Sequence, residues 1–434
     1  MAESHHSVNM GKKGNKQDCS TYRGISLLSH TGKMFARILE QRIRPIVEPS
    51  LSLAQHGFRK GRGCTDAVFA LRQICEKSIE HQEQTNIAFI DQEKAFDRVN
   101  RNTLWGVLEE YGIKGPLLDC VRALYRSSES AVRTSVGTTS WFQITSGVRQ
   151  GCVLSPLLFI IYMDKITQID QTPCGEDHSN VVEELIFADD QCLLHSKPEH
   201  LQDHMTALHN NCSRYNMKIN TEKTEIMVIN SEHTDIQVKI DNQVLKQVSE
   251  FKYLGSFFTE DGRCDREIET RIQQANKVTF QLSPILKHPA IKIGIKRNII
   301  NAVFIPTLCY QCQTWTLNKD QVRKINTCEM RCMRKALNKT RRDHVRNEEI
   351  RKTVGTTPVI NFIEKQRLKW FGHLMRMNPT MPAAKAYNQR RESARGRGRP
   401  RRRWIEGVKD ILKRYSTTTH LATERALSRT SLIK

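Results

Sequence analysis

The sequence lacks a long hydrophobic run. Its longest mostly apolar stretch, Val153–Met163, spans eleven residues and includes Ser155 and Pro156, whereas a membrane-spanning helix needs about twenty apolar residues. Residues 1–16 are polar and contain no apolar centre of the kind that a secretory signal carries. From these absences we expect an intracellular protein that is neither secreted nor inserted in a membrane.

A disulfide framework is also absent. The 13 cysteines are an odd number, and without secretion they are better explained as reduced thiols. The pairs Cys309/Cys312 and Cys328/Cys332 have spacings that would suit zinc. They lie, however, in an apolar stretch and in a helical stretch, which favours buried thiols. We therefore predict no zinc site.

Negative charge is scarce in the last quarter of the chain. The whole sequence has 68 Lys and Arg against 46 Asp and Glu, a net charge of +22. Residues 1–320 hold 38 basic and 37 acidic side chains, whereas residues 321–434 hold 30 and 9. Such an excess indicates an acidic partner, and nucleic acid is the first candidate.

The chain has no internal repeat, and its composition changes near residue 265. Before this point short apolar strands alternate with helical stretches, and after it basic helices follow, with Ile268, Ile272 and Ala275 on one apolar stripe. Beyond Met381 the sequence is rich in Pro, Gly and Arg, which predicts a partly disordered region. The expected fold class is α+β with a mainly helical, basic C-terminal region.

Two segments carry carboxylates at the ends of apolar strands. The predicted strand Ile87–Ile90 stops at Asp91, and Glu184–Leu194 predicts a β-hairpin with Asp189 and Asp190 at its tip. Hard oxygen ligands on strand ends suit Mg²⁺, whose other sites are filled by water and substrate phosphates. An isolated Asp-Asp pair at a turn is usually ordinary solvated turn chemistry. The second carboxylate strand favours a metal site instead.

Seven short motifs follow one another in a specific order. They are YRGISLL at 22–28, QHGFRKGRGCTD at 55–66, the segment Asp91–Val99, the segment Gly147–Phe159, FADD at 187–190, NTEKT at 220–224 and FKYLG at 251–255. Together they closely resemble the reverse transcriptase of non-LTR (LINE-type) retrotransposons, in particular the RTE and jockey groups. The resemblance extends from Lys12 to at least Trp404.

The resemblance implies an RNA-directed DNA polymerase with a right-hand fold. It would comprise an N-terminal tail and fingers over 1–85 and a palm with an antiparallel sheet over 86–264. Thumb-like helices would follow over 265–345, and a basic C-terminal nucleic-acid-binding region over 346–434. Such an enzyme adds dNTPs to the 3′-end of a primer on an RNA template. The implied partners are template RNA, a DNA primer or target DNA, and dNTPs, in the nucleus and the cytoplasm.

The resemblance also implies roles for the palm residues. Asp91, Asp189 and Asp190 would form the catalytic triad that binds two Mg²⁺ ions, with Mn²⁺ as an alternative, and Asp97 would pair locally instead. The residues implied in dNTP binding are Arg23, Lys33, Phe96, Gln150 and Lys223. Phe96 would reject ribonucleotides by a clash with the 2′-hydroxyl, and Lys223 would protonate the leaving pyrophosphate. Core packing for Phe96 and a solvated helix face for Lys33 are the alternatives.

Further residues are expected to contact nucleic acid. Gly147 and Gly151 would let the backbone approach it closely. The direct contacts are assigned to Arg59, Lys60, Arg62, Gly255, Arg397, Arg399, Arg401, Arg402 and Arg403. A solvated loop is the alternative for Arg59, Lys60 and Arg62. A nuclear-import signal and a merely solvated charge run are the alternatives for the arginines of 397–403. Deleting residues 385–434 is expected to weaken binding and leave the metal chemistry intact.

One part of the family pattern is missing from this sequence. Complete elements carry an apurinic-type endonuclease upstream of the polymerase, and nothing here resembles it. We therefore expect a truncated or split-off open reading frame. A catalytically idle nucleic-acid-binding relic and a splicing-maturase-like binder are the alternatives to an active polymerase.

Overall fold

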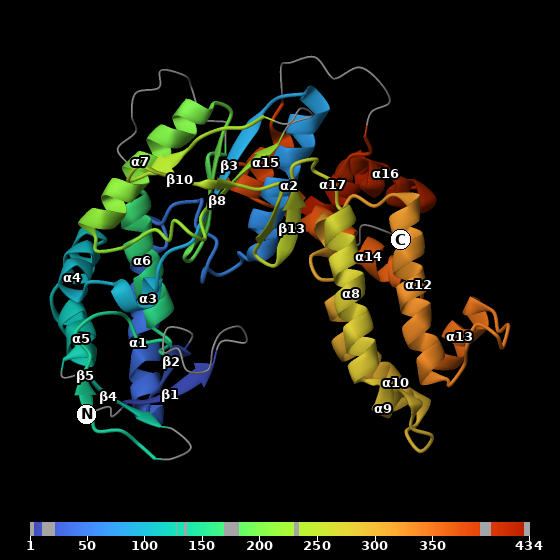
Figure 1. The fold of residues 1–434 in the computed structure, drawn as a ribbon, viewed down its shortest axis with the longest axis horizontal. Coiled ribbons are helices and arrows are strands. Elements are labelled where there is room, and N and C mark those ends of the chain that lie inside the picture. Colours follow the sequence, from blue (N-terminus) through green and yellow to red (C-terminus); the bar gives the residue numbers. More distant parts are fainter. Residues whose placement is uncertain are drawn as a thin grey trace. The chain divides into compact units, whose positions relative to one another are not determined.

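The computed structural model describes residues 4–10, 22–126, 128–133, 137–168, 182–229, 234–390 and 401–428 of the 434. Helices and strands are mixed throughout, as the α+β prediction requires. The chain forms two compact units (Figure 1). The first consists of Met1–Ala67, Asn86–Ile226 and Ile236–Gln247, and the second of Val68–Thr85, Met227–Asp235 and Val248–Lys434. Both units are discontinuous in sequence, and the four-part division into fingers, palm, thumb and C-terminal region stays a prediction.

The elements in chain order have the following bounds. The strands are β1 (Ser4–Met10), β2 (Tyr22–Leu27), β3 (Thr85–Ile90), β4 (Glu129–Arg133), β5 (Phe142–Gln143), β6 (Glu184–Phe187), β7 (Asp190–His195), β8 (Glu225–Ile229), β9 (Lys239–Ile240), β10 (Gln243–Val244), β11 (Lys246–Gln247), β12 (Glu250–Tyr253) and β13 (Ser256–Thr259). The helices are α1 (His30–Val47), α2 (Cys64–His81), α3 (Ala95–Arg98), α4 (Arg101–Glu110), α5 (Pro116–Tyr125), α6 (Ser155–Thr167), α7 (Pro198–Arg214), α8 (Asp265–Gln281), α9 (Ser283–Lys287), α10 (Ile293–Ile299), α11 (Ile305–Leu308), α12 (Lys319–Ala336), α13 (Asn347–Val354), α14 (Val359–Met375), α15 (Pro382–Asn388), α16 (Trp404–Arg414) and α17 (Thr419–Leu427), with the helical turns η3 (Ile300–Phe304) and η4 (Cys312–Thr314).

A five-stranded sheet in the order β11-β8-β3-β7-β6 carries the predicted carboxylates. Every residue of β3 is buried, which explains why its segment Ile87–Ile90 is apolar without alternation. Strand β7 pairs antiparallel with both β3 and β6. The predicted hairpin is confirmed, although its tip is shorter than expected: Ala188 and Asp189 form the turn, and Asp190 already belongs to β7.

A second sheet has the order β2-β1-β4-β5. The polar segment Ser4–Met10, for which the sequence predicts no element, is strand β1, paired antiparallel with β2 and parallel with β4. A polar strand of this kind forms through its partners' backbone groups, so side-chain periodicity does not reveal it.

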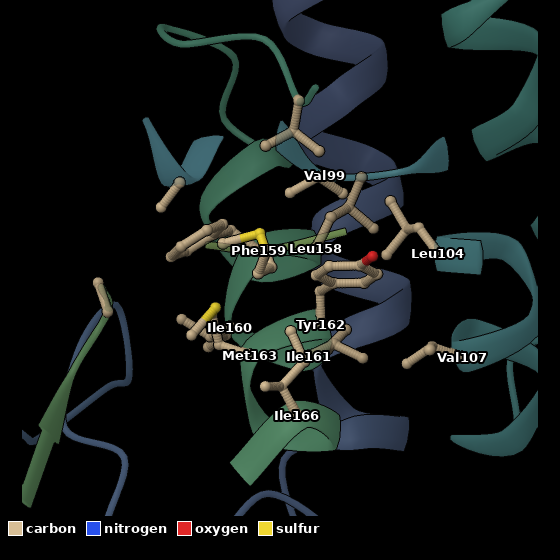
Figure 2. Packing of buried hydrophobic residues seen from close by; sticks show 14 of the residues in the cluster. Val99, Leu104, Val107, Leu158, Phe159, Ile160, Ile161, Tyr162, Met163 and Ile166 are labelled. Carbon is tan, nitrogen blue, oxygen red and sulfur yellow. The ribbon is translucent and has the colours of Figure 1, made fainter. Parts of the chain in front are cut away.

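Helix α6 forms the centre of the core in the first unit (Figure 2). Pro156 stands in its first turn, where the missing N–H costs nothing. Its side chains from Leu157 to Met163 are buried, and the close-up shows them among Val99, Leu104 and Val107. Full burial of one such side chain contributes about 1.5–3 kcal/mol. The longest apolar run of the sequence is therefore a buried core helix.

The second unit is mainly helical. Helices α8 and α12 lie side by side (Figure 1), and α14 packs against α16 and α17. Residues 404–414 and 419–427 form α16 and α17, so the prediction of a partly disordered region is wrong for these two segments. The reason is Trp404, whose side chain is fully buried and meets the ring of Phe69 edge-on at 4.8 Å. Among the described residues, no helix is long and apolar enough to cross a membrane.

Candidate active site

Asp91 directly follows β3, and hydrogen bonds of its backbone to the NTEKT segment fix its position. Its N–H donates to Thr224 Oγ1 at 3.4 Å, and its carbonyl accepts the N–H of Asn220 at 2.8 Å. The side chain of Asn220 in turn accepts the N–H groups of Glu222 and Lys223. The NTEKT motif is thus a tight turn that ties the end of β3 to the start of β8.

Asp189 lies in the turn between β6 and β7, and a second loop supports this turn. Ala188 has a φ of +60°, a conformation that costs energy for an L-residue with a side chain. The fully buried Gln55 holds it in place, because its Oε1 accepts the N–H of Ala188 at 3.0 Å and that of Gly57 at 2.7 Å. A Cβ on Gly57 would stand 2.5 Å from the nitrogen of Ala188. Sequence reasoning missed this role of Gln55, whose only signal is its place in the QHGFRKGRG motif.

The strand register brings the carboxylates to one end of the sheet. Ile90 lies opposite Gln191, and Phe187 lies opposite Asp190. Asp91 directly follows Ile90, so it lies at the same end of the sheet as Asp189 and Asp190. Asp190 is exposed and Asp189 is half-buried, so solvent reaches both carboxylates at this end of the sheet.

Lys223 joins this group of carboxylates. Its Nζ lies 3.6 Å from Oδ2 of Asp91, and its side chain remains 68% exposed. An exposed ion pair of this kind contributes little to stability. The ion pair instead keeps one exposed cation beside the acidic end of the sheet.

The donor set consists of hard carboxylate oxygens, which fits Mg²⁺. Within the described part of the chain, no group of three or more His, Cys, Asp and Glu side chains is arranged so that it could hold a metal ion alone. The predicted three-carboxylate ligand set is therefore not assembled by these side chains themselves. Mg²⁺ in proteins is commonly held by one or two carboxylates together with waters and substrate phosphates, and an open edge provides for such ligands.

Phe96 lies on the short helix α3, five residues after Asp91. Its ring stacks on that of Phe159 with centroids 4.2 Å apart and meets Phe58 edge-on at 6.5 Å. One face of Phe96 is thus used by the core, and the side chain is only partly buried. The core-packing alternative and the role beside the sugar are both compatible with this placement.

Gly147 and Gly151 permit a close approach between chain segments. Gly147 has a φ of +80°, and a Cβ there would stand 2.9 Å from the Cα of Asp97. A Cβ on Gly151 would stand 2.7 Å from the carbonyl oxygen of Ser26. Contacts within the protein therefore explain both glycines, and their predicted close approach to nucleic acid stays a prediction. Between them, Gln150 donates to Oδ1 of Asp97 at 3.4 Å.

Comparison with known proteins decides the family. A family model described as reverse transcriptase (RNA-dependent DNA polymerase) matches residues 11–258, more than half of the chain. The chain belongs to the reverse transcriptase family. The right-hand polymerase class and the α+β prediction are thereby confirmed. Members of this family depend on divalent metal ions, in agreement with the acidic sheet edge.

Several relatives of this reverse transcriptase come from non-LTR retrotransposons. A probable RNA-directed DNA polymerase from transposon X-element of Drosophila melanogaster is 26% identical over 89% of this chain and 42% of the relative. The polymerase from mobile element jockey of the same species is 26% identical over 73% and 36%. The polyprotein from retrotransposable element R2 of Popillia japonica is 26% identical over 74% and 46%. The chain thus spans less than half the length of these relatives. A solved telomerase from Candida tropicalis, in complex with a fragment of telomeric RNA, aligns over 89% of this chain and 65% of its own, with 10% identity and a TM-score of 0.44.

The predicted fingers cations of this reverse transcriptase are only partly described. Arg23 lies in β2 opposite Asn9, and its side chain lies outside the described residues. Lys33 lies in the first turn of α1, which begins after the cap Ser29, and is half-buried. Their roles in dNTP binding stay predictions.

Arg59 is engaged by the protein itself, and its predicted contact with a template phosphate stays a prediction. Its side chain is 3% exposed, and its Nε donates to Glu48 Oε1 at 2.7 Å. The rest of its guanidinium donates to the carbonyls of Glu48, Leu51, Ser52 and Gln55. Arg59 therefore holds together the loop that positions Gln55. Sequence alone does not distinguish this role, because a basic glycine-rich loop is also typical of phosphate contact.

The neighbours of Arg59 differ from it. Arg62 is half-buried and donates to the carbonyls of Leu53 and Gln55 at 2.8 and 3.0 Å, and burial lowers its pKa to about 10. Lys60 is exposed. Of the three predicted loop cations, Lys60 remains the best placed to meet a phosphate.

Gly255 lies at the tip of the β12–β13 hairpin in the second unit. It has a φ of +82°, and a Cβ there would stand 3.2 Å from the ring of Tyr310. The Tyr310 hydroxyl donates to the carbonyl of Leu254 at 3.2 Å, and Arg271 donates to that of Gly255. Glycine is thus required here by the protein's own packing, and its predicted contact with nucleic acid stays a prediction.

The C-terminal arginines that are described all contact the protein. Arg401 donates to the carbonyl of Asp261 at 2.6 Å, Arg402 pairs with Asp410, and Arg403 pairs with Glu406 at 3.0 Å and Glu80 at 3.5 Å. Arg397 and Arg399 lie outside the described residues. Arg401–Arg403 therefore help to dock α16, besides any nucleic-acid contact that the sequence predicts for them.

The cysteines considered for zinc are buried thiols, as predicted. Cys309, Cys312, Cys328 and Cys332 all lie in the core of the second unit. A hydrogen bond with Cys312, together with burial, raises the pKa of Cys309. Burial raises the pKa of Cys328 to about 12 and that of Cys332 to about 11. Such thiols stay protonated and unreactive at neutral pH.

Proposed function

We propose that this chain is an RNA-directed DNA polymerase (EC 2.7.7.49) of a non-LTR retrotransposon. It would add dNTPs to the 3′-end of a primer on an RNA template. The observation that carries the proposal is the register of β3, β7 and β6, which brings Asp91, Asp189 and Asp190 to one edge of the sheet beside Lys223. The family match over residues 11–258 supports it.

The chemistry needs metal ions that the carboxylates can hold. Asp91 and Asp189, with Asp190 beside them, would bind two Mg²⁺ ions, or Mn²⁺ in their place. When bound, such ions activate the primer hydroxyl and stabilise the charge of the leaving pyrophosphate. A pair of ions needs more ligands than these side chains supply, and the phosphates of the incoming dNTP are suited to complete the set.

The other side chains orient the substrate and move protons. Lys223 stands next to Asp91 with its ammonium group exposed, and it is placed to neutralise or protonate a phosphate oxygen at that edge. Phe96 would limit the space at the 2′ position of the nucleotide, and Gln150 would contact the nascent base pair. We propose the nucleus and the cytoplasm as the sites of action, where template RNA and target DNA are found.

The substitution Asp189→Asn tests the site. It removes one ligand charge and keeps the shape of the turn, so we expect extension of a DNA primer on an RNA template to fall by several orders of magnitude, to background. Asp203→Asn is the matched control, because Asp203 is an exposed carboxylate on α7 of the same unit.

Persistent extension by Asp189→Asn would overturn the site assignment. If wild-type protein binds an RNA–DNA hybrid and never extends it, with Mg²⁺ or with Mn²⁺, the chain is instead a catalytically idle nucleic-acid-binding relic.

A further inference from the structure

An open pocket with a volume of about 980 Å³ lies along α12 in the second unit. We call it the α12 pocket. Eight of its fifteen lining residues are Lys or Arg, and none of the fifteen is Asp or Glu. It is formed by the end of α9, the exposed side of α12, the turn after α12 and the first residue of α13. Neither the carboxylate edge nor the β12–β13 hairpin contributes a residue to it.

Little negative charge offsets the cations of the pocket, because their hydrogen-bond partners are largely neutral. Arg331 donates to Oδ1 of Asn276 at 2.9 Å. Arg334 donates to Oδ1 of Asn347 at 2.8 Å and to the carbonyl of Val345 at 3.2 Å. Within the described part of the chain, Arg323 alone of these cations pairs with a carboxylate, that of Asp320, and both side chains are more than 70% exposed. Such a surface pair is weak.

One carboxylate, that of Asp343 in the turn after α12, lies next to the pocket: it accepts the N–H and the hydroxyl of Thr340 at 2.6 and 2.9 Å, and these hydrogen bonds, followed by the charge of Lys339, lower its pKa. Two other acidic side chains near α12 are paired away from the pocket cations. Glu329 is fully buried and pairs with Arg351, besides accepting the N–H of Val359 at 2.8 Å. Glu269 of α8 pairs with Lys324 at 3.0 Å. The helix thus separates its charges: the carboxylate of Glu329 faces the core, and the unpaired positive charge faces the pocket.

Helix stability alone does not explain this pattern. Arg334 and Lys335 stand in the last turn of α12, where cations stabilise the negative end of the helix dipole. Lys319 stands at the first position of the helix, where a cation is unfavourable. Arg323 and Arg331 lie in between, and Lys339 lies beyond the end. A ligand of negative charge accounts for the whole set.

We propose that the α12 pocket binds the phosphodiester backbone of the template RNA outside the stretch that is being copied. This inference rests on the proposed function for the identity of the strand. Thr327 and Asn338 also line the pocket. The Thr327 hydroxyl donates to the carbonyl of Arg323 at 2.8 Å and the Asn338 amide to that of Lys287 at 3.0 Å, so their side-chain oxygens are left as acceptors for a 2′-hydroxyl. The site provides affinity with little sequence readout, because phosphates carry no sequence information.

The test is a charge-neutralising variant of the full chain, Lys319→Gln/Arg323→Gln/Lys335→Gln/Lys339→Gln. Arg331 and Arg334 are left in place because they hold Asn276 and Asn347. The matched control, Lys114→Gln/Lys197→Gln/Lys239→Gln/Lys246→Gln, removes the same charge from exposed positions of the first unit. Both sets are made in the Asp189→Asn background, and binding of a short single-stranded RNA is measured without divalent metal.

We expect the pocket variant to bind this RNA about 10- to 100-fold more weakly at low salt, with the control close to the parent. The slope of log K against log salt should become shallower by about 0.7 for each phosphate that the variant no longer neutralises. Equal binding by the pocket variant and the control would overturn the proposal.

Circular dichroism of both variants separates misfolding from a direct effect on RNA binding. The single substitutions Lys319→Gln and Lys339→Gln, at exposed positions, repeat the test with less risk to the fold.

Single-stranded DNA of the same sequence distinguishes the source of the phosphates. Tighter binding of RNA, with the advantage lost in the pocket variant, supports the template assignment, and an equal loss for RNA and DNA would contradict it. Because binding is measured without extension, the outcome is independent of the polymerase assay. If the wild-type chain never extends a primer, the proposed polymerase function is wrong. The RNA-binding measurement still tests the pocket independently.

Discussion

At the scale of single residues, Gln55 decides the shape of the candidate site. It contacts neither metal nor substrate in the structure, yet its amide oxygen accepts the two backbone N–H groups that hold the FADD turn against the loop before α2. Buried donors without an acceptor are costly, and Ala188 already stands in a strained conformation. The turn that carries Asp189 is therefore stable only with this support.

The substitution Gln55→Ala should destabilise the first unit and lower polymerase activity together. It would leave two buried N–H groups without an acceptor, at roughly 2–4 kcal/mol in total. Urea unfolding and primer extension measure the two effects. Gln41→Ala, at an exposed position of α1, is the control and should change neither. Unchanged stability and activity in Gln55→Ala would show that the turn holds without this support.

The substitution Phe96→Ala separates the two explanations of that ring. If Phe96 borders the nucleotide sugar, the ratio of kcat/KM for a ribonucleotide over that for a dNTP should rise by about tenfold or more. If Phe96 only packs against Phe159, unfolding occurs earlier and the ratio stays constant. Phe142→Ala removes an exposed ring from the same unit and serves as the control.

At the scale of elements, the C-terminal helices are built into the second unit. Glu76 of α2 is partly buried, and its Oε2 accepts hydrogen bonds from the N–H of Trp404 at 2.7 Å and from the hydroxyl of Thr316 at 3.4 Å. Lys77 donates to the carbonyls of Ala386 and Tyr387 at 2.6 and 2.8 Å. The deletion of residues 385–434 would thus expose core surface as well as remove cations. Substitution of charges is therefore a cleaner test of nucleic-acid binding than this deletion.

Glu76 also makes the stability of this unit depend on pH. Burial raises its pKa from the ordinary 4.5 to about 7, so the folded state binds a proton that the unfolded chain has lost. Its contribution to stability is present below pH 4.5 and is lost as the pH rises to about 7, at a cost of about 3 kcal/mol.

The substitution Glu76→Gln keeps an acceptor for Trp404 and removes the titration. We expect it to flatten the pH dependence of the urea midpoint between pH 5 and 8 and to raise the midpoint at pH 8 relative to the wild type. Glu348→Gln, at an exposed position of α13, should leave the pH profile unchanged. An unchanged slope in Glu76→Gln would assign the pH dependence to other groups.

At the scale of the whole molecule, the charge is divided along the chain. The first 320 residues are nearly neutral and hold the carboxylate edge, whereas the remaining 114 carry almost all of the net charge of +22. Part of this charge is used internally, since Arg351 and Arg403 pair with carboxylates of the second unit. The remaining cations include those of the α12 pocket. Part of the excess positive charge is therefore concentrated in this pocket, where a polyanion can bind.

The sequence by itself determined the family, the fold class and the three candidate carboxylates. Each of these depends on local information: Asp91 follows an apolar strand, Asp189 and Asp190 stand at a hairpin turn, and the motifs keep their order along the chain. The strand Ile87–Ile90 and the hairpin were therefore predictable to within a residue or two at their ends.

Only the tertiary structure decided which polar residues bind other parts of the protein and which remain exposed. Arg59 and Lys60 are adjacent in the same basic loop, yet one is buried among carbonyls and the other is exposed. Trp404 follows a run of arginines and is a core residue. The α12 pocket combines one side of α12 with the end of α9, the turn after α12 and the first residue of α13. Burial and pairing depend on contacts between segments far apart in sequence, and composition and periodicity carry no record of those contacts.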